Sequence, residues 1–173
     1  RQNSPSNEFF KLDMGQEDLP DQLSARKFDI ISAFDVLFHI TDDIRYRNAI
    51  SNINRLLRKD GFFLFSENFL HHDVVRSQHQ VSRPPVSIER IIQETGFQIL
   101  DRIPMFVIMN APVDANSGIL PSTWKLIRST AKKGKFASNV TGGILYPLEL
   151  ILTRIAKEGP STELMICKKL EGR

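Results

Sequence analysis

The chain has 173 residues, of which 41% are hydrophobic and 25% are charged, and its formal net charge is +3 at pH 7. This length fits one globular domain with a substantial core. The single cysteine, Cys167, excludes an internal disulfide framework and favours a reducing compartment, so we expect a cytoplasmic protein. No apolar run is long enough to span a bilayer, and the polar N-terminus lacks the apolar core of a secretory signal. We therefore expect no stable membrane insertion.

The basic residues are concentrated in the last third of the chain. Residues 121–173 carry ten basic and four acidic side chains, whereas residues 1–72 carry nine basic and eleven acidic ones. Such a local excess indicates one basic surface and argues against a general nucleic-acid-binding protein. A solvated helix face is the ordinary explanation for Lys132, Lys133 and Lys135, and contact with an anion or a membrane surface is the alternative.

The chain reads as a series of strands and helices. Strand-like segments are expected at residues 8–14, 28–33, 61–69, 97–109 and 163–169, the fourth of them broken by Pro104. A helix is expected to begin near Thr41 or Asp42, which are good N-caps, and to be stopped by Gly61. A shorter helix is expected at residues 86–95. Strand, helix and strand within about forty residues form a βαβ unit, which builds a parallel sheet, so the sequence predicts an α/β fold.

More than fifty residues separate the last two expected strands, whereas a hairpin would need only about two to five. The segment 111–160 is therefore predicted to be an insertion with its own structure. It is expected to hold a basic amphipathic helix at residues 120–133 and a second helix at residues 147–158, with Pro147 in its first position.

Polar side chains follow each strand of the predicted βαβ unit. Ligands of parallel sheets bind beyond the carboxyl ends of the strands. The side chains expected at this edge of the sheet are Asp35, His39, Glu67, His71 and His72.

The order of these motifs resembles that of a class I S-adenosylmethionine-dependent methyltransferase. Residues 28–40, FDIISAFDVLFHI, and residues 55–67, RLLRKDGFFLFSE, resemble the fourth and fifth strands of such proteins with the helix end between them. Residues 94–97, ETGF, resemble the motif before the sixth strand, and residues 163–169, ELMICKK, resemble the final antiparallel strand. The chain departs from the family at residues 59–62, KDGF, where many relatives carry Pro-Gly-Gly.

The resemblance covers about residues 8–110 and 160–170 and leaves the insertion out. It implies a Rossmann-like methyltransferase sheet that is N-terminally incomplete, since no G-x-G pair of the glycine-rich first motif occurs. Residues 1–173 would then form a single partial methyltransferase-like domain. The resemblance also implies S-adenosyl-L-methionine as the cofactor and a small molecule as the methyl acceptor. We expect this activity in a longer parent protein, and this chain alone to be inactive.

Five cofactor contacts are implied by the resemblance. They are Asp13 and Met14, the acidic residue and apolar neighbour of the third-strand motif that lie by the adenine, and Ala33, Phe34 and Asp35 at the end of the fourth strand. The alternatives are a strand end and a turn at the first pair, a core position for Phe34, and a turn aspartate at Asp35.

The acceptor side of the site is expected after the fourth and fifth strands. His39 is the candidate catalytic base, because a neutral imidazole can take a proton near neutral pH, and the alternative is a histidine that only bonds its loop. Glu67, His71 and His72 are the candidate substrate contacts, and a strand terminus with a mobile polar loop is the alternative. No metal site is expected, since adjacent histidines lack standard ligand spacing.

A second hypothesis treats the chain as a non-catalytic interaction module. Without the first two strands, the strand at residues 28–33 would lie at the edge of the sheet. An apolar edge strand invites pairing with another chain, so this hypothesis predicts a homodimer through the exposed edge.

Overall fold

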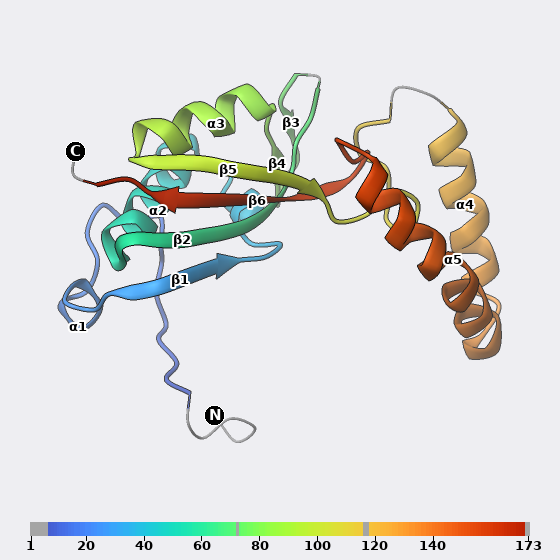
Figure 1. Cartoon of the computed structure of the whole chain (residues 1–173), viewed down its shortest axis with the longest axis horizontal. Helices are drawn as coiled ribbons and strands as arrows, with labels where there is room; N and C mark the ends of the chain where they lie inside the picture. Colours follow the sequence, from blue (N-terminus) through green and yellow to red (C-terminus); the bar gives the residue numbers. More distant parts are fainter. Residues whose placement is uncertain (1–6, 72, 116–117, 172–173) are drawn as a thin grey trace.

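The computed structural model describes residues 7–71, 73–115 and 118–171. It consists of an α/β body and a helical hairpin that projects from one end of the sheet (Figure 1). The predicted α/β fold with a helical insertion is therefore confirmed. Among the helices in these ranges, none combines the length and the apolar character needed to cross a bilayer.

The main sheet has four strands in the order β1, β2, β6, β5. Their bounds are Phe28–Ala33 for β1, Leu57–Asn68 for β2, Thr162–Lys169 for β6 and Phe97–Pro104 for β5. β1 and β2 are parallel, whereas β6 runs antiparallel to both β2 and β5. β1 is thus an edge strand in the described part of the chain. Strands β3 (Val75–Arg76) and β4 (Val81–Ser82) form a separate two-stranded ribbon.

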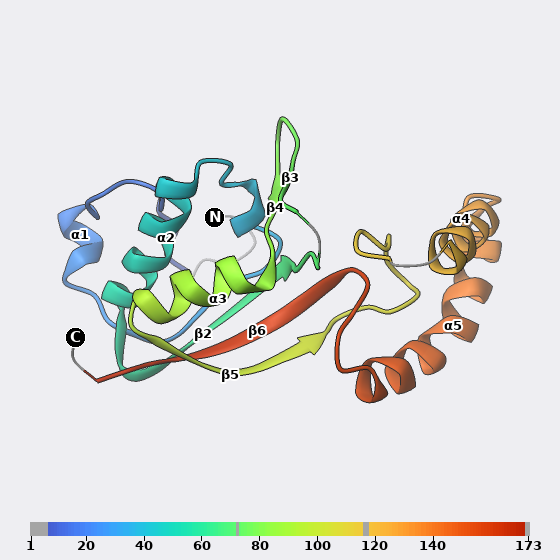
Figure 2. The same ribbon diagram turned by 90° about the horizontal axis from the view of Figure 1, so that it is seen from above.

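One side of the sheet carries the helices of the body, as Figure 2 shows. These helices are α1 (Asp21–Ser24), α2 (Asp43–Leu56) and α3 (Pro85–Glu94). The Asp42 carboxylate caps α2, because its Oδ1 accepts the Arg45 backbone N–H at 2.9 Å. The core lies between these helices and the sheet. Its fully buried members include Tyr46, Ile50, Phe63, Phe65, Ile88, Ile92, Phe97 and Met165.

The other side of the sheet is left bare by the described residues (Figure 2). Ile30 of β1 is 62% exposed, and Phe62 and Ile103 are also exposed. Ile30 and Phe62 are register partners, so β1 and β2 present adjacent apolar side chains there. Apolar side chains on a bare sheet face are a surface that favours burial against another layer.

Two expectations for the body are wrong. Residues 8–14 form no strand, since Asn52 of α2 donates to the Met14 carbonyl oxygen and this segment lies along the helix instead of in the sheet. Gly61 does not stop α2, which ends at Leu56. Gly61 lies inside β2, where a Cβ would come within 3.0 Å of the Asp29 and Arg58 carbonyl oxygens, so glycine is needed for close approach.

The insertion contains α4 (Ile119–Ala131) and α5 (Lys135–Ile155), which pack against each other. The prediction that a helix begins at Pro147 is wrong, because Pro147 lies inside α5. Proline has no N–H to donate, which costs the helix one bond there. Packing against α4 along residues 138–145 extends α5 toward its N-terminus. The hairpin leaves the body at the end of the sheet where β1 and β2 reach their C-termini (Figure 1).

Candidate active site

The C-terminal ends of β1 and β2 are joined by a pair of hydrogen bonds between Asp35 and Ser66. The Asp35 backbone N–H donates to Ser66 Oγ at 2.7 Å, and Ser66 Oγ–H donates to Asp35 Oδ1 at 3.0 Å. Asp35 has a φ of 53°, in the left-handed region that aspartate tolerates better than most residues. This turn brings the candidate cofactor residues Ala33, Phe34 and Asp35 together at the strand end, with Phe34 49% exposed.

Glu67 follows Ser66 but points into the core. Its side chain is fully buried, and within the described residues neither carboxyl oxygen has a hydrogen-bond partner. Burial raises the pKa of Glu67 to about 8, although the positive charge of Arg83 opposes the shift. Glu67 therefore holds a proton at neutral pH. A substrate cannot reach the buried carboxyl group in this conformation, so the role of Glu67 as a substrate contact remains a prediction.

Tyr46 and Arg83 both lie close enough to Glu67 for their charges to influence one another. Burial first, and then the charge of Glu67, raise the pKa of the Tyr46 hydroxyl well above its ordinary value. The Arg83 guanidinium lies 3.9 Å from the centre of the Tyr46 ring, and its Nη2 donates to Asp43 Oδ1 at 2.9 Å. Sequence reasoning missed both residues, since they come from α2 and from the residue after β4, far from Glu67 in the chain.

His39 lies in a short 3-10 helix, Leu37–His39, directly after the β1 turn. Its Nδ1 is 2.8 Å from the His79 carbonyl oxygen. A carbonyl can only accept, so Nδ1 carries the proton and, in the neutral ring, Nε2 carries the lone pair. The ring is exposed and could act as a base through Nε2. The catalytic role of His39 remains a prediction.

His71 lies three residues after the end of β2, and its side chain contacts residues at both ends of the insertion. Its Nδ1 bonds Asp114 Oδ2, and its Nε2 lies 2.9 Å from Glu158 Oε2. The hydrogen bond with Asp114 raises the pKa of His71, and the charge of Glu158 adds to this shift, against a smaller opposing effect of burial. Sequence reasoning missed this role, because nothing local links residue 71 to residues 114 and 158. His72 lies outside the described residues.

Asp13 and Met14 contact α2 rather than the β1 edge. Asp13 accepts the Gly15 backbone N–H at 3.0 Å and bonds Arg45, whose side chain holds the pKa of Asp13 below its usual value. Met14 packs against the core, and its carbonyl oxygen accepts from Asn52 at 3.0 Å. Among the described residues, no hydrogen bond or ion pair joins Asp13 or Met14 to residues 33–35. Their proposed adenine contact therefore remains a prediction.

Metal-ligating side chains in the described part of the chain are not gathered at this edge. In residues 7–71, 73–115 and 118–171, no group of three or more His, Cys, Asp or Glu side chains is placed to hold a metal ion.

Residues 3–102 match the family model described as a methyltransferase domain, so the chain belongs to the methyltransferase domain family. The match includes β1, α2, β2 and α3 and ends before the insertion. The resemblance inferred from the sequence motifs is thereby confirmed. No curated protein matches the chain.

Solved methyltransferases share the fold. The O-methyltransferase from the trans-AT PKS multienzyme of Brevibacillus brevis, solved with S-adenosyl-L-homocysteine, is 18% identical, with a TM-score of 0.53 over 93% of this chain and 48% of that chain. An O-methyltransferase family protein from Burkholderia thailandensis is 12% identical, with a TM-score of 0.51 over 96% of this chain and 36% of that one. The chain thus spans half or less of the length of these two structures, and its Rossmann-like methyltransferase sheet is confirmed.

Proposed function

We propose that this chain supplies one wall of a methyltransferase that uses S-adenosyl-L-methionine as the methyl donor and a small molecule as the acceptor. The observation that best supports the proposal is the Asp35–Ser66 pair, which closes the C-terminal ends of two parallel strands in a member of this family. The activity is assigned to a longer parent protein, located in the cytoplasm, and we expect the 173-residue chain alone to be inactive.

The residues at the C-terminal end of β1 are of types that can bind such a cofactor. Phe34 is 49% exposed and precedes Asp35 in the turn, and Ala33 is partly buried against the core. An aromatic ring can stack on an adenine base, and a carboxylate accepts hydrogen bonds from hydroxyl or amino groups. We assign Ala33, Phe34 and Asp35 to the cofactor, with Asp13 and Met14 as further adenine contacts.

When bound, this cofactor supplies a methyl group on a positively charged sulfonium. Methyl transfer is a direct displacement that depends on alignment of donor and acceptor. The new bond joins the methyl carbon to the acceptor atom, the bond from that carbon to sulfur breaks, and the acceptor loses its proton. His39 Nε2 is the proposed recipient of that proton, because its Nδ1–H is held by the His79 carbonyl oxygen.

Glu67, His71 and His72 are the proposed acceptor contacts. Glu67 is buried and His71 is bonded to Asp114 and Glu158, so either contact requires these residues to rearrange when the acceptor binds. Loss of the contacts of His71 with Asp114 and Glu158 on acceptor binding would support this part of the proposal.

The decisive test is calorimetric titration of the longer parent protein with S-adenosyl-L-methionine. We expect binding, and a loss of about ten-fold in affinity in Asp35→Ala, since a hydrogen bond to a charged group contributes about 1.5 kcal/mol. Asp29→Ala is the matched control, because Asp29 is an exposed aspartate at the other end of β1. Absence of binding by the parent would overturn the proposal.

The alternative function is self-association through β1. The observation that favours it is the edge position of β1 with Ile30 62% exposed, since an unpaired apolar edge can add a strand from a second copy. Light scattering at micromolar concentration tests it. A dimer that Ile30→Lys converts to a monomer supports edge pairing, provided that Val86→Lys on α3 has no effect. A monomeric mass for the unmodified chain would exclude it.

A further inference from the structure

Helix α5 carries a continuous apolar stripe that the described residues leave uncovered. Its members are Phe136, Val140, Ile144, Leu148, Ile151 and Ile155, each between 44 and 83% exposed. Their spacing of four, four, four, three and four residues puts them on one face of the helix. At 21 residues, α5 is about 30 Å long, so the stripe is an extended surface.

The stripe faces away from α4. Thr141, Gly142 and Leu145 of α5 line a hollow with Trp124 and Ile127 of α4, which places these residues on the side of α5 that meets its partner helix. On a helix, residues 142 and 145 lie on the side of α5 away from most of the stripe, whereas residue 141 lies beside Leu148 at its border. Packing within the hairpin therefore does not bury the apolar face.

The hairpin also carries an excess of positive charge, which is concentrated in residues 125–135. Residues 115–148 include Lys125, Arg128, Lys132, Lys133 and Lys135 and contain no aspartate or glutamate. The acidic residue that follows, Glu149, is buried and accepts backbone N–H groups of the body, so its charge is used internally. The outer surface of the hairpin thus combines apolar and cationic side chains.

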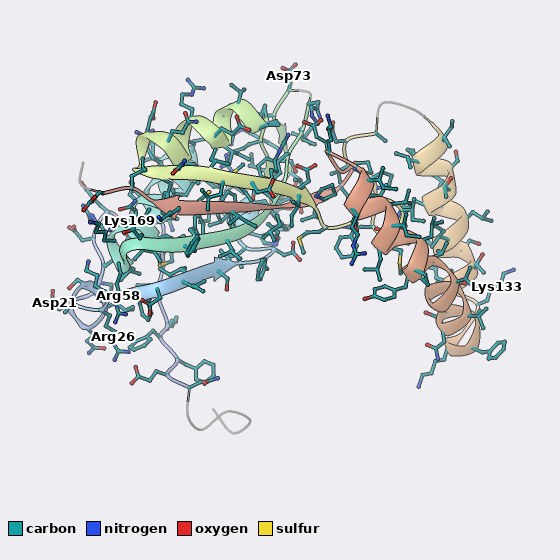
Figure 3. The ribbon with its side chains drawn as sticks, in the orientation of Figure 1. Asp21, Arg26, Arg58, Asp73, Lys133 and Lys169 are labelled. Atoms are coloured by element: carbon teal, nitrogen blue, oxygen red, sulfur yellow. The ribbon has the colours of Figure 1, made fainter. Side chains whose placement is uncertain are left out.

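These two properties meet at the tip of the hairpin. Gly134, with a φ of 143°, forms the turn between α4 and α5, and Phe136 follows it with 83% of its surface exposed. Figure 3 shows Lys133 at this tip, at the opposite end of the molecule from Arg26 and Arg58. The tip is therefore at the opposite end of the molecule from the starts of β1 and β2.

We propose that the hairpin docks on an anionic phospholipid surface, with the α5 stripe in the interface and the tip lysines against head-group phosphates. Amphipathic helices with aromatic and aliphatic residues on one face and lysines beside it bind in this way without crossing the bilayer. If two copies paired their stripes in the same direction, two positive tips would meet, which disfavours that arrangement. Nucleic acid would use the lysines and leave the aliphatic stripe without a contact.

Co-sedimentation with vesicles tests the proposal directly. We expect binding to vesicles of phosphatidylcholine mixed with phosphatidylglycerol and no binding to phosphatidylcholine alone. Lys132→Gln/Lys133→Gln should weaken binding on the order of 25-fold, because each lysine near an anionic surface contributes about five-fold. The matched control Lys11→Gln/Arg90→Gln removes two exposed cations outside the hairpin and should leave binding unchanged.

The apolar contribution needs its own pair of variants. Phe136→Ser should weaken vesicle binding at least several-fold, whereas Val86→Ser, which alters a similarly exposed apolar residue on α3, should not. The proposal is overturned by equal binding to both vesicle types, by equal losses in the hairpin and control variants, or by no binding at all. It is also overturned if Phe136→Ser abolishes self-association in solution without changing vesicle binding, since a second copy would then cover the stripe.

Discussion

Asp114 accepts two hydrogen bonds from the single residue His71. The His71 backbone N–H lies 3.1 Å from Asp114 Oδ2, and the His71 Nδ1 contacts the same oxygen. The opposite ring nitrogen lies 2.9 Å from Glu158 Oε2. Carboxylates only accept, so an imidazole bonded on both sides by carboxylates is protonated. His71 therefore acts as a cationic link between the end of β2 and both ends of the insertion.

This link predicts that the stability of the fold depends on pH. The pKa of His71 is raised above its ordinary value, first by the hydrogen bond with Asp114. A raised histidine pKa stabilises the folded state fully below the unfolded value, near 6.5, and this stabilisation is lost as pH rises through the folded value. We expect His71→Gln to lower the melting temperature at about pH 6 and to have less effect at about pH 9.

The link is partly exposed to solvent, so its contribution is modest, about 1 kcal/mol. Scanning calorimetry of the wild type and His71→Gln across this pH range measures it. His79→Gln serves as the control, because its exposed side chain lies in the same loop region. An identical melting difference at both ends of the pH range would show that protonation of His71 does not stabilise the fold.

The ionisation of Glu67 should also make the stability of the fold depend on pH. Burial raises its pKa to about 8, so the folded state holds a proton that the unfolded chain releases near its ordinary pKa. Stability should therefore fall as pH rises between the two pKa values. Glu67→Gln removes the ionisation and should be more stable than the wild type at about pH 8, by on the order of 2 kcal/mol.

Urea unfolding of Glu67→Gln and wild type at about pH 5 and about pH 8 gives the comparison. The two proteins should differ little at the lower pH. Glu94→Gln is the control, since that carboxylate is exposed and pairs with Arg47 at the surface. A wild-type protein whose stability does not fall over this interval would mean that Glu67 is ionised in the fold.

Ser66→Ala tests the turn that closes the proposed cofactor edge. The variant removes the hydroxyl that accepts from the Asp35 N–H and donates to its carboxylate, so it should cost about 1 kcal/mol of stability. In the parent protein it should also weaken cofactor binding, because the Asp35 turn is no longer held. Ser32→Ala, on the exposed side of β1, should change neither property. Unchanged cofactor affinity in Ser66→Ala would separate this turn from the binding site.

Local sequence patterns predicted the elements whose boundaries depend on local chemistry. The Asp42 cap predicted where α2 begins, and β1, β6 and α3 were predicted within one residue of their observed bounds. The predictions for Gly61 and Pro147 were wrong, because glycine usually marks the end of a helix and proline its start. Gly61 instead allows close backbone approach inside β2, and Pro147 lies within a helix that is extended by packing against α4.

Contacts distant in the sequence could not be predicted from it. The strand-end candidates Asp35 and Glu67 were identified by their position after apolar runs, yet the partner of Asp35 and the burial of Glu67 depend on how two strands align. The His71 link joins residues 43 and 87 positions apart, and no local periodicity encodes such a pair. Family resemblance supplied the fold and left these contacts open.

Glu149 attaches the hairpin to the body through hydrogen bonds to the segment after β5. Its buried carboxylate accepts the Val107 N–H at 2.6 Å and the Ile108 N–H at 3.0 Å, in the segment after β5. Hydrogen bonds to a charged acceptor contribute about 1.5 to 3 kcal/mol each, and an N–H left unpaired in a buried place loses more. Glu149→Ala should therefore destabilise the attachment of α5 by about 2 to 3 kcal/mol.

Hydrogen exchange at residues 107 and 108 reports on this attachment locally, whereas a melting curve reports on the whole fold. Glu149→Ala should speed exchange of these two amides, and Glu149→Gln, which retains one acceptor oxygen, should have a smaller effect. Amides of β2 and β6, which are held by the sheet, should exchange as in the wild type in both variants. Uniformly faster exchange across β2, β6 and residues 107 and 108 would instead mean that Glu149 stabilises the entire domain, and that the hairpin and the sheet unfold as one unit.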